Sequence, residues 1–265
     1  MLVIIGLIIG GILVGREMIQ AAEIRAQVSQ VEKYNAAANT FRIKYGYLPG
    51  DIQAAQASAF GFTTRSGIKG EGDGDGLLKA CNYLAVFAGF YAGHSLGCET
   101  TLFWHDLSDA NLIDGKFTGT NALNAYTTIS QLESVIPRAK FANSFIAAIS
   151  MSGAYTRPPR VGNYYYIGEI TGQDVHGNVS VKFSITPLQA YDIDKKNDDG
   201  SPVSGGVQFR GQQYGYPGHT TTSIGDLVNI GNWSGRTGCV DETTNLYNYK
   251  NTNDKTCILI ILGVY

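Results

Sequence analysis

The alternation of apolar and polar residues divides the start of the chain into two segments. Residues 1–15 (MLVIIGLIIGGILVG) are almost entirely apolar, and residues 16–45 carry charged and apolar positions in a mixed pattern. No turn signal separates the two, and the first strong one is Gly46 followed by residues 48–51 (LPGD). The pattern predicts one helix that ends near Tyr45 and is about 68 Å long. A rod of that length needs a partner beyond its own domain.

In residues 16–45, apolar side chains recur at the spacing of an amphipathic helix and predict the face that packs on a globular domain. This predicted stripe consists of Ile19, Ala22, Ala26, Val28, Val31, Tyr34, Ala38, Phe41 and Tyr45. Residues 1–15 are too short to span a bilayer, which takes about 20 apolar residues, unless further residues precede Met1. They also lack the basic start and the small-residue cleavage site of a signal peptide.

The apolar segment contains glycines at spacings that favour close contact between helices. Gly6 with Gly10, and Gly11 with Gly15, fit the small-xxx-small pattern. Glycine costs about 1 kcal/mol in a helix interior, so these residues indicate an assembly contact rather than a passive membrane anchor, which is the alternative. We expect them to form an assembly interface together with Ile4, Ile5, Leu7, Ile8, Ile9, Ile12 and Leu13.

The rest of the chain predicts short strands and helices separated by polar and glycine-rich turns. Strand-like runs lie at 144–150, 163–171, 178–185, 206–210 and 257–262. Helices are predicted at 77–92, at 103–112 and after Thr186, where Pro187 would take the first helical position. These elements favour an α+β fold, in which a long N-terminal helix packs on a mainly antiparallel β-sheet.

Composition and motifs argue against catalysis and against nucleic acid as a principal partner. The chain has 265 residues, a net charge of −2 and only 16% charged residues, without a basic stripe. The sequence contains no HExxH, GxSxG, P-loop or GxGxxG motif. Its four histidines are scattered, and none lies at a useful spacing from a second metal-ligand type: His94, His105, His176 and His219. We therefore expect no enzymatic activity.

The cysteines predict disulfide bonds rather than a zinc or haem site. Cys81, Cys98, Cys239 and Cys257 show no CxxC or CxxCH spacing. Of the three possible pairings we favour the local ones, Cys81–Cys98 and Cys239–Cys257, each worth about 3 kcal/mol in the chain-entropy model. Four free buried thiols are the alternative.

Two groups of acidic residues are candidate calcium sites. Glu71, Asp73 and Asp75 alternate with glycines and match the first positions of a calcium loop, although the twelfth position is Asn82. The alternative for this segment is a solvated Gly/Asp turn. The second group, which is interrupted by lysines and could equally form a salt-bridged surface turn, comprises Asp192, Asp194, Asp198 and Asp199.

The N-terminal segment resembles a known family. LVIIGLIIGGILVG followed by AAEIRAQVSQVEKYNAAANTFRIKYGYLPGD is similar to the N-terminal helix of type IV pilins and pseudopilins, which carry the prepilin-type cleavage/methylation signature. Three later segments resemble a subgroup of large prepilin-like proteins: GEGDGDGLL (70–78), LFWHDLSDANLIDGKFTG (102–119) and ITPLQAYDIDKKNDDGSPVSGGV (185–207). The resemblance implies an assembly helix at 1–45 and a globular head at 46–265 with a disulfide-closed C-terminal loop. Because certain pseudopilins bind calcium, it also favours Ca²⁺ as the ion at either acidic group.

The chain departs from the family in one respect. Family members have an N-methylated first residue and, a few residues later, a glutamate that is thought to pair with the N-terminus of a neighbouring subunit. No glutamate lies between Met1 and Gly15. Matching Gly6 to the glycine of the family helix implies about eight further residues upstream, which would also bring the apolar run to the length of a bilayer. Alternatively, Met1 is the mature terminus and Ile5 stands where the glutamate would fall.

The functional expectation is a structural subunit of a type IV pilus-like filament. The resemblance implies a helical homopolymer on the cell surface, an inner-membrane precursor with a periplasmic head, and prepilin peptidase and pilus assembly machinery as partners. One alternative is a type II secretion system pseudopilin. The other is a membrane-anchored adhesin head that does not polymerise.

Overall fold

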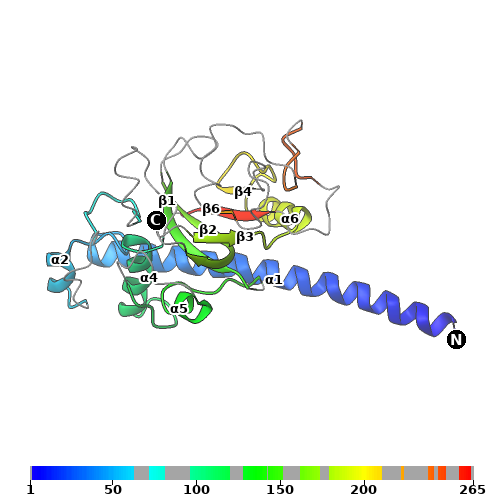
Figure 1. Cartoon of the computed structure of the whole chain (residues 1–265), viewed down its shortest axis with the longest axis horizontal. Helices are drawn as coiled ribbons and strands as arrows, with labels where there is room; N and C mark the ends of the chain where they lie inside the picture. Colours follow the sequence, from blue (N-terminus) through cyan, green and yellow to red (C-terminus); the bar gives the residue numbers. More distant parts are fainter. Residues whose placement is uncertain are drawn as a thin grey trace.

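Helix α1 (Leu2–Tyr45) is the longest element, and its first half extends beyond the rest of the molecule (Figure 1). This computed structural model describes residues 2–62, 72–80, 96–119, 128–141, 143–151, 162–173, 179–210, 222–223, 238–241, 244–248 and 257–263. Among residues 2–13, the side chains it describes are those at positions 4 and 10–12. The helix ends at the predicted residue, because Gly46 adopts a φ of +76° and its N–H bonds to the carbonyl oxygen of Arg42.

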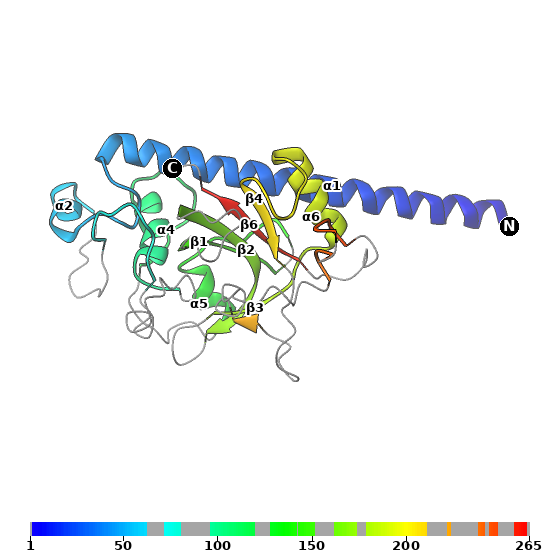
Figure 2. The same cartoon turned by 90° about the horizontal axis from the view of Figure 1, so that it is seen from above.

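The described strands form one antiparallel sheet beside α1 (Figure 2). Their order is β4–β6–β2–β3–β5, and β1 also pairs with β2. The predicted C-terminal strand is an interior one, since β6 lies between β4 and β2. The strands are β1 (Phe145–Met151), β2 (Gly162–Gln173), β3 (Val179–Lys182), β4 (Val207–Arg210), β5 (Thr222–Ser223) and β6 (Ile258–Leu262). The long helix and the antiparallel sheet make the fold α+β, as predicted.

Four shorter helices accompany the sheet: α2 (Ala54–Ala59), α4 (Glu99–Asp109), α5 (Ile129–Glu133) and α6 (Pro187–Asn197). Thr186 caps α6 through a capping box with Gln189, and Pro187 takes the first turn as expected. Helix α4 starts four residues before the predicted boundary at 103. The predicted helix at 77–92 is wrong over residues 77–80, which are not helical, and residues 81–92 lie outside the described part of the chain.

The second half of α1 joins the core through an aromatic cluster. The Tyr34 ring lies edge-on to Trp104 of α4, with 4.9 Å between ring centroids, and 6.4 Å from the ring of Tyr165 of β2. Trp104 and Tyr165 are fully buried. Aromatic pairs in such tilted arrangements add about 0.5–1.5 kcal/mol to the gain from burial. The cluster therefore fixes α1 against both α4 and the sheet.

The face that α1 turns to the head differs in part from the predicted stripe. Val31, Tyr34, Ala38 and Phe41 are buried, as predicted. Ile19, Ala22 and Ala26 are exposed, and Ile24 is buried in their place. The error arose because the apolar residues of 19–28 lie on more than one face of the helix, and only contact with the head selects one of them.

Candidate functional site

The protruding half of α1 is the first candidate site. Figures 1 and 2 both show the N-terminus well away from the sheet and the other helices. Ile12, Val14, Met18 and Ile19 each expose more than half of their surface. Apart from its chain neighbours and the backbone of its own helix, a Cβ built at Gly10, Gly11 or Gly15 would meet no atom within 4 Å. This half of α1 thus presents apolar and small residues with no packing partner in the described chain.

The other residues of the predicted interface lie between Ile4 and Leu13 of α1. Ile4 is exposed. The backbone of Ile5, Gly6, Leu7, Ile8, Ile9 and Leu13 is helical, but their side chains lie outside the described residues. Among the residues with described side chains, no helix combines the length and the apolar character needed to cross a membrane.

Polar contacts attach α1 to the segment that precedes β1. The Oε1 of buried Gln27 accepts a hydrogen bond of 2.7 Å from the Lys140 backbone N–H. One turn later, Gln30 donates to the carbonyl oxygen of Arg138 at 2.9 Å. No local sequence pattern indicates these contacts, because their partners are more than 100 positions away along the chain.

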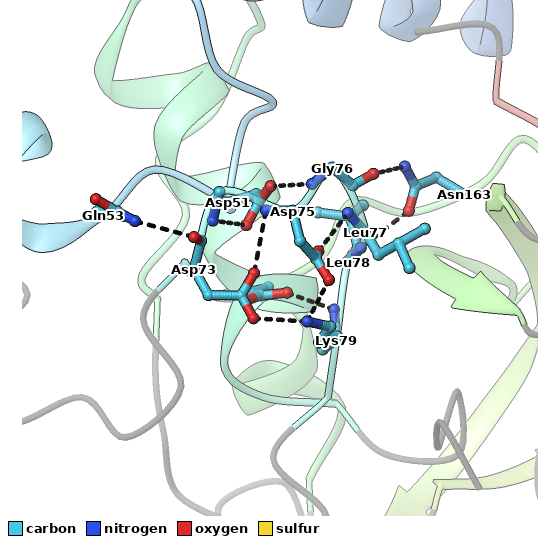
Figure 3. A network of polar contacts seen from close by, with 11 residues as sticks. Asp51, Gln53, Asp73, Asp75, Gly76, Leu77, Leu78, Lys79 and Asn163 are labelled. Atoms are coloured by element: carbon cyan, nitrogen blue, oxygen red, sulfur yellow. Dashed lines mark hydrogen bonds and ion pairs between the residues drawn. The ribbon is translucent and has the colours of Figure 1, made fainter. Parts of the chain in front are cut away.

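The first acidic group is organised around Asp51, which the sequence analysis had treated only as part of a turn (Figure 3). The two carboxylate oxygens of Asp51 accept hydrogen bonds from the backbone N–H groups of Gly74, at 2.7 Å, and Gly76, at 2.6 Å. Asp73 and Asp75 lie on the same loop, and one oxygen of each approaches Asp51 to within 4.8 Å. Glu71 lies outside the described residues. The loop that was predicted to wrap a calcium ion thus wraps the Asp51 carboxylate.

Lys79 provides the positive charge of this group. Its Nζ lies 2.6 Å from an oxygen of Asp73 and 2.5 Å from an oxygen of Asp75. Although partial burial opposes it, the hydrogen bond and charge of Lys79 lower the pKa of Asp73 below its ordinary value. Burial has the larger effect on Asp51, whose pKa is raised despite its two N–H donors. The ammonium group therefore already holds the position between the two aspartates that a cation would need.

Two further buried carboxyl groups lie behind this loop, and sequence reasoning missed both. Glu99, at the start of α4, accepts a hydrogen bond of 2.6 Å from the Lys79 backbone N–H. Burial raises the pKa of Glu99 to about 8, with Asp51 and Asp73 adding to the effect against the opposing influence of Lys79. Asp106 accepts a hydrogen bond of 2.6 Å from the Gly50 N–H. Asp106 thus holds the turn that follows α1, and Glu99 holds the loop at residues 72–80. No sequence motif signals either role.

The second acidic group joins α6 to β4. Asp194, Asp198 and Asp199 lie together, whereas Asp192 is not part of the group. Asp198 accepts hydrogen bonds from the backbone N–H groups of Gly206 and Val207. Asp199 accepts one from the backbone N–H of Ser201 and one from the hydroxyl of Ser204. These oxygens serve as acceptors for the loop before β4. Within the described part of the chain, neither Lys195 nor Lys196 forms an ion pair with these aspartates, so the predicted salt-bridged turn is not found there. The Nζ of Lys195 lies over the Tyr191 ring instead.

A disulfide bond closes the C-terminal loop. Cys239 and Cys257 are bonded, with 5.0 Å between their Cα atoms, which confirms the favoured pairing. Cys98 is also disulfide-bonded, and Cys81, its predicted partner, lies outside the described residues. The bond at Cys257 fixes the loop to the first residues of β6.

The histidine for which the structure provides contacts has a structural role. The Nδ1 of His105 lies 2.8 Å from the carbonyl oxygen of Phe117, while the neighbouring Asp106 bonds to Gly50. His94, His176 and His219 lie outside the described residues. The adjacent His105 and Asp106 are thus bonded to different segments.

No protein-family model, curated protein or solved structure matches the chain.

Proposed function

We propose that the chain is a structural subunit of a type IV pilus-like extracellular filament, which polymerises through the N-terminal half of α1. One observation carries the proposal: the described apolar side chains of this segment are exposed on a helix that extends beyond the head, namely those of Ile4, Ile12, Val14, Met18 and Ile19. Contiguous apolar surface of this kind marks a site for protein or membrane contact. Each Ile, Leu or Val that becomes fully buried between neighbouring helices contributes roughly 1.5–3 kcal/mol.

The pilin-like form of the fold is part of this proposal. Its support is the division of α1, in which one half packs on an antiparallel sheet and the other half is left outside. The same division follows from the resemblance of residues 1–45 to the pilin helix. Under the proposal, the head of residues 46–265 lies on the outside of the polymer.

The proposed assembly pathway follows the resemblance. The precursor is held in the inner membrane with its head in the periplasm, prepilin peptidase trims and methylates it, and the pilus machinery extracts it. The glycines at 10, 11 and 15 favour close approach of neighbouring helices. A type II secretion pseudopilin would use the same contacts in a short periplasmic assembly, and an anchored adhesin would not polymerise at all.

Cryo-electron microscopy of fibres sheared from cells that express the chain from its natural start tests the proposal. We expect helical fibres in which α1 lies in the centre and the head outside. Long surface fibres distinguish the pilus from the pseudopilin. Chain found only in envelope fractions, without fibres, would contradict the proposal and favour the adhesin.

The variant Gly10→Leu separates assembly from folding. Leucine is a better helix former than glycine by about 0.8 kcal/mol, and the space around Gly10 is open within the chain. The head should therefore fold normally, while close approach of neighbouring helices is blocked. We expect far fewer fibres with unchanged thermal unfolding of the head, and a normal fibre yield would contradict the assigned contact.

A further inference from the structure

Strand β6 occupies an interior place in the sheet and pairs along both of its edges (Figure 2). Residues 259–262 pair with residues 164–167 of β2, and residues 258–261 pair with residues 207–210 of β4. The first three residues of β6 are almost completely buried. Among the described strands, β4 pairs with β6 alone. The sheet therefore depends on β6 to join β4 to β2.

Without β6, a gap of defined shape would lie between β2 and β4. One wall would stay in place because β1 and β3 also pair with β2. The other wall is held by Asp198, which accepts hydrogen bonds from the N–H groups of Gly206 and Val207. Unpaired strand edges are templates for another chain, and an added strand gains main-chain hydrogen bonds from them. The gap thus has the properties of a strand-accepting site.

The strand that fits this gap is β6, from the same chain or from a second copy. A second copy offers the same run, ILIIL, in the same register on both edges. Exchange of an identical element between two copies costs little, because each copy keeps all the contacts of that element. The strength with which β6 is tied to its own chain therefore decides between the two sources.

The backbone by itself ties β6 loosely to the elements before it. Tyr247, in the C-terminal loop, is held on α6 by a hydrogen bond to Asp194 and by ring contact with Tyr191. Strand β6 begins 11 positions later, at Ile258. A chain of that length reaches up to about 36–40 Å, whereas a five-residue strand is about 17 Å long. This connection alone would let β6 enter the sheet of a neighbouring copy.

The disulfide between Cys239 and Cys257, which we call the lock, removes this freedom. It holds the residue before β6 close to Cys239, with 5.0 Å between the Cα atoms. Cys239 is itself fixed in the C-terminal loop, because its carbonyl oxygen accepts a hydrogen bond from the Asn248 N–H and the next residue, Val240, pairs with Tyr247. With the lock closed, β6 cannot enter another copy without taking this loop from α6.

We propose that the gap between β2 and β4 is a strand-accepting site for β6 of a second copy of this chain, and that the lock prevents this exchange. Two copies that exchange β6 form a closed dimer, and successive transfers join more than two copies. The inference does not depend on the proposed filament, since the contacts of β6 lie in the sheet and not on the protruding half of α1.

A disulfide between β4 and β6 can report the exchange. Val207 and Ile261 are Cα partners on these strands. The adjacent pair, Gly206 and Leu262, carries the hydrogen bond, so Val207 and Ile261 form a pair of the non-hydrogen-bonded type. The Cα atoms of such a pair lie about 4.5 Å apart, within the range that a disulfide allows. Cysteines at these two positions of different chains can therefore bond when β6 has been exchanged.

The test uses two full-length chains that lack the lock through C239A/C257A. One carries Val207→Cys, and the other carries Ile261→Cys and a different tag. The two are unfolded, refolded together without reductant at about pH 5, where thiol–disulfide exchange is slow, and then oxidised. We expect a disulfide-bonded heterodimer whose share rises with protein concentration, because exchange is bimolecular.

Three controls accompany this mixture. The same two chains with the lock intact should give at least about tenfold less heterodimer, because the lock keeps β6 at a high effective concentration beside its own sheet. Ile129→Cys, at an exposed position of α5, replaces Ile261→Cys to measure random collisions and should give no product. Gln27→Leu in the locked chains lowers stability without opening the lock, and should not increase the product.

Two results would overturn the inference: no heterodimer from the unlocked chains, or equal amounts from the locked and unlocked chains. Amide hydrogen exchange at residues 164–167 shows whether the unlocked chains form the sheet. If they do not, the refolding is repeated in trimethylamine N-oxide, which favours compact states. Absence of the heterodimer under those conditions would overturn the inference as well.

Discussion

The hydroxyl of Tyr247 donates a hydrogen bond of 2.5 Å to the carboxylate of Asp194, and so joins the C-terminal loop to α6. The two residues are 53 positions apart, and both are buried. Burial raises the pKa of Asp194 to about 6, with Asp198 and Asp199 adding to the effect, although the Tyr247 hydroxyl and the Gly200 N–H lower it. The hydrogen bond thus offsets part of the cost of burying this carboxyl group.

We expect Tyr247→Phe to destabilise the fold by about 1–3 kcal/mol, the usual cost of a buried group that has lost its partner. Because the folded pKa of Asp194 is raised, its contribution to stability is greatest at low pH and is lost as the pH rises from about 4 to about 6. Without the hydroxyl, the charged form is penalised further. Unfolding in denaturant should therefore show that Tyr247→Phe lowers the free energy of unfolding more at pH 8 than at pH 4. An equal decrease at the two pH values would contradict this account.

The contact between Gln27 and Lys140 predicts how α1 is held on the head. Gln27→Leu keeps an apolar stem but leaves the Lys140 N–H without its acceptor. We expect the free energy of unfolding to fall by about 1–3 kcal/mol. We also expect faster amide hydrogen exchange at residues 138–140. Gln20→Leu, at an exposed position of the same helix, is the control and should have little effect. Unchanged exchange in Gln27→Leu would show that the hydrogen bond does not hold this segment.

Glu99 predicts a second pH dependence. Its folded pKa is about 8, against an ordinary value of 4.5, so the folded state binds a proton that the unfolded state releases. The corresponding stability is fully present below about pH 4.5 and is lost as the pH rises to about 8. Glu99→Gln copies the protonated form and should remove this loss, which makes it more stable than the wild type at pH 9. Unfolding in denaturant at pH 5, 7 and 9 measures the stability of both proteins. Glu17→Gln, on the protruding half of α1, is the control and should keep the pH dependence of the wild type.

Lys79 predicts the response of the loop at residues 72–79 to calcium. Its ammonium group lies between Asp73 and Asp75, so we expect the wild type to bind Ca²⁺ weakly. Lys79→Met should cost about 0.5–1 kcal/mol, as partly exposed ion pairs do. It also leaves the carboxylates of Asp51, Asp73 and Asp75 without that cation, so calorimetric titration should give a Ca²⁺ affinity higher by at least about tenfold. Tight binding by the wild type would show that the loop holds calcium in the presence of Lys79.

The sequence by itself determined the elements whose signals are local. The turn residues after Tyr45 defined the end of α1, the apolar runs marked β1, β2 and β6, and Pro187 marked the first turn of α6. The short separation of Cys239 and Cys257 favoured their pairing. Such features depend on backbone conformation and on neighbours within a few turns, and single-residue preferences encode both.

Only the tertiary structure decided which groups meet. The predicted stripe of α1 failed at Ile19, Ala22 and Ala26, since the position of the head selects the buried face and periodicity alone does not. Likewise, the loop predicted to bind a cation uses Lys79 and wraps Asp51, a residue more than 20 positions away. Buried carboxyl groups such as Glu99 take their partners from whatever backbone the fold brings to them. Those partners follow from packing over long sequence separations, which local spacing does not record.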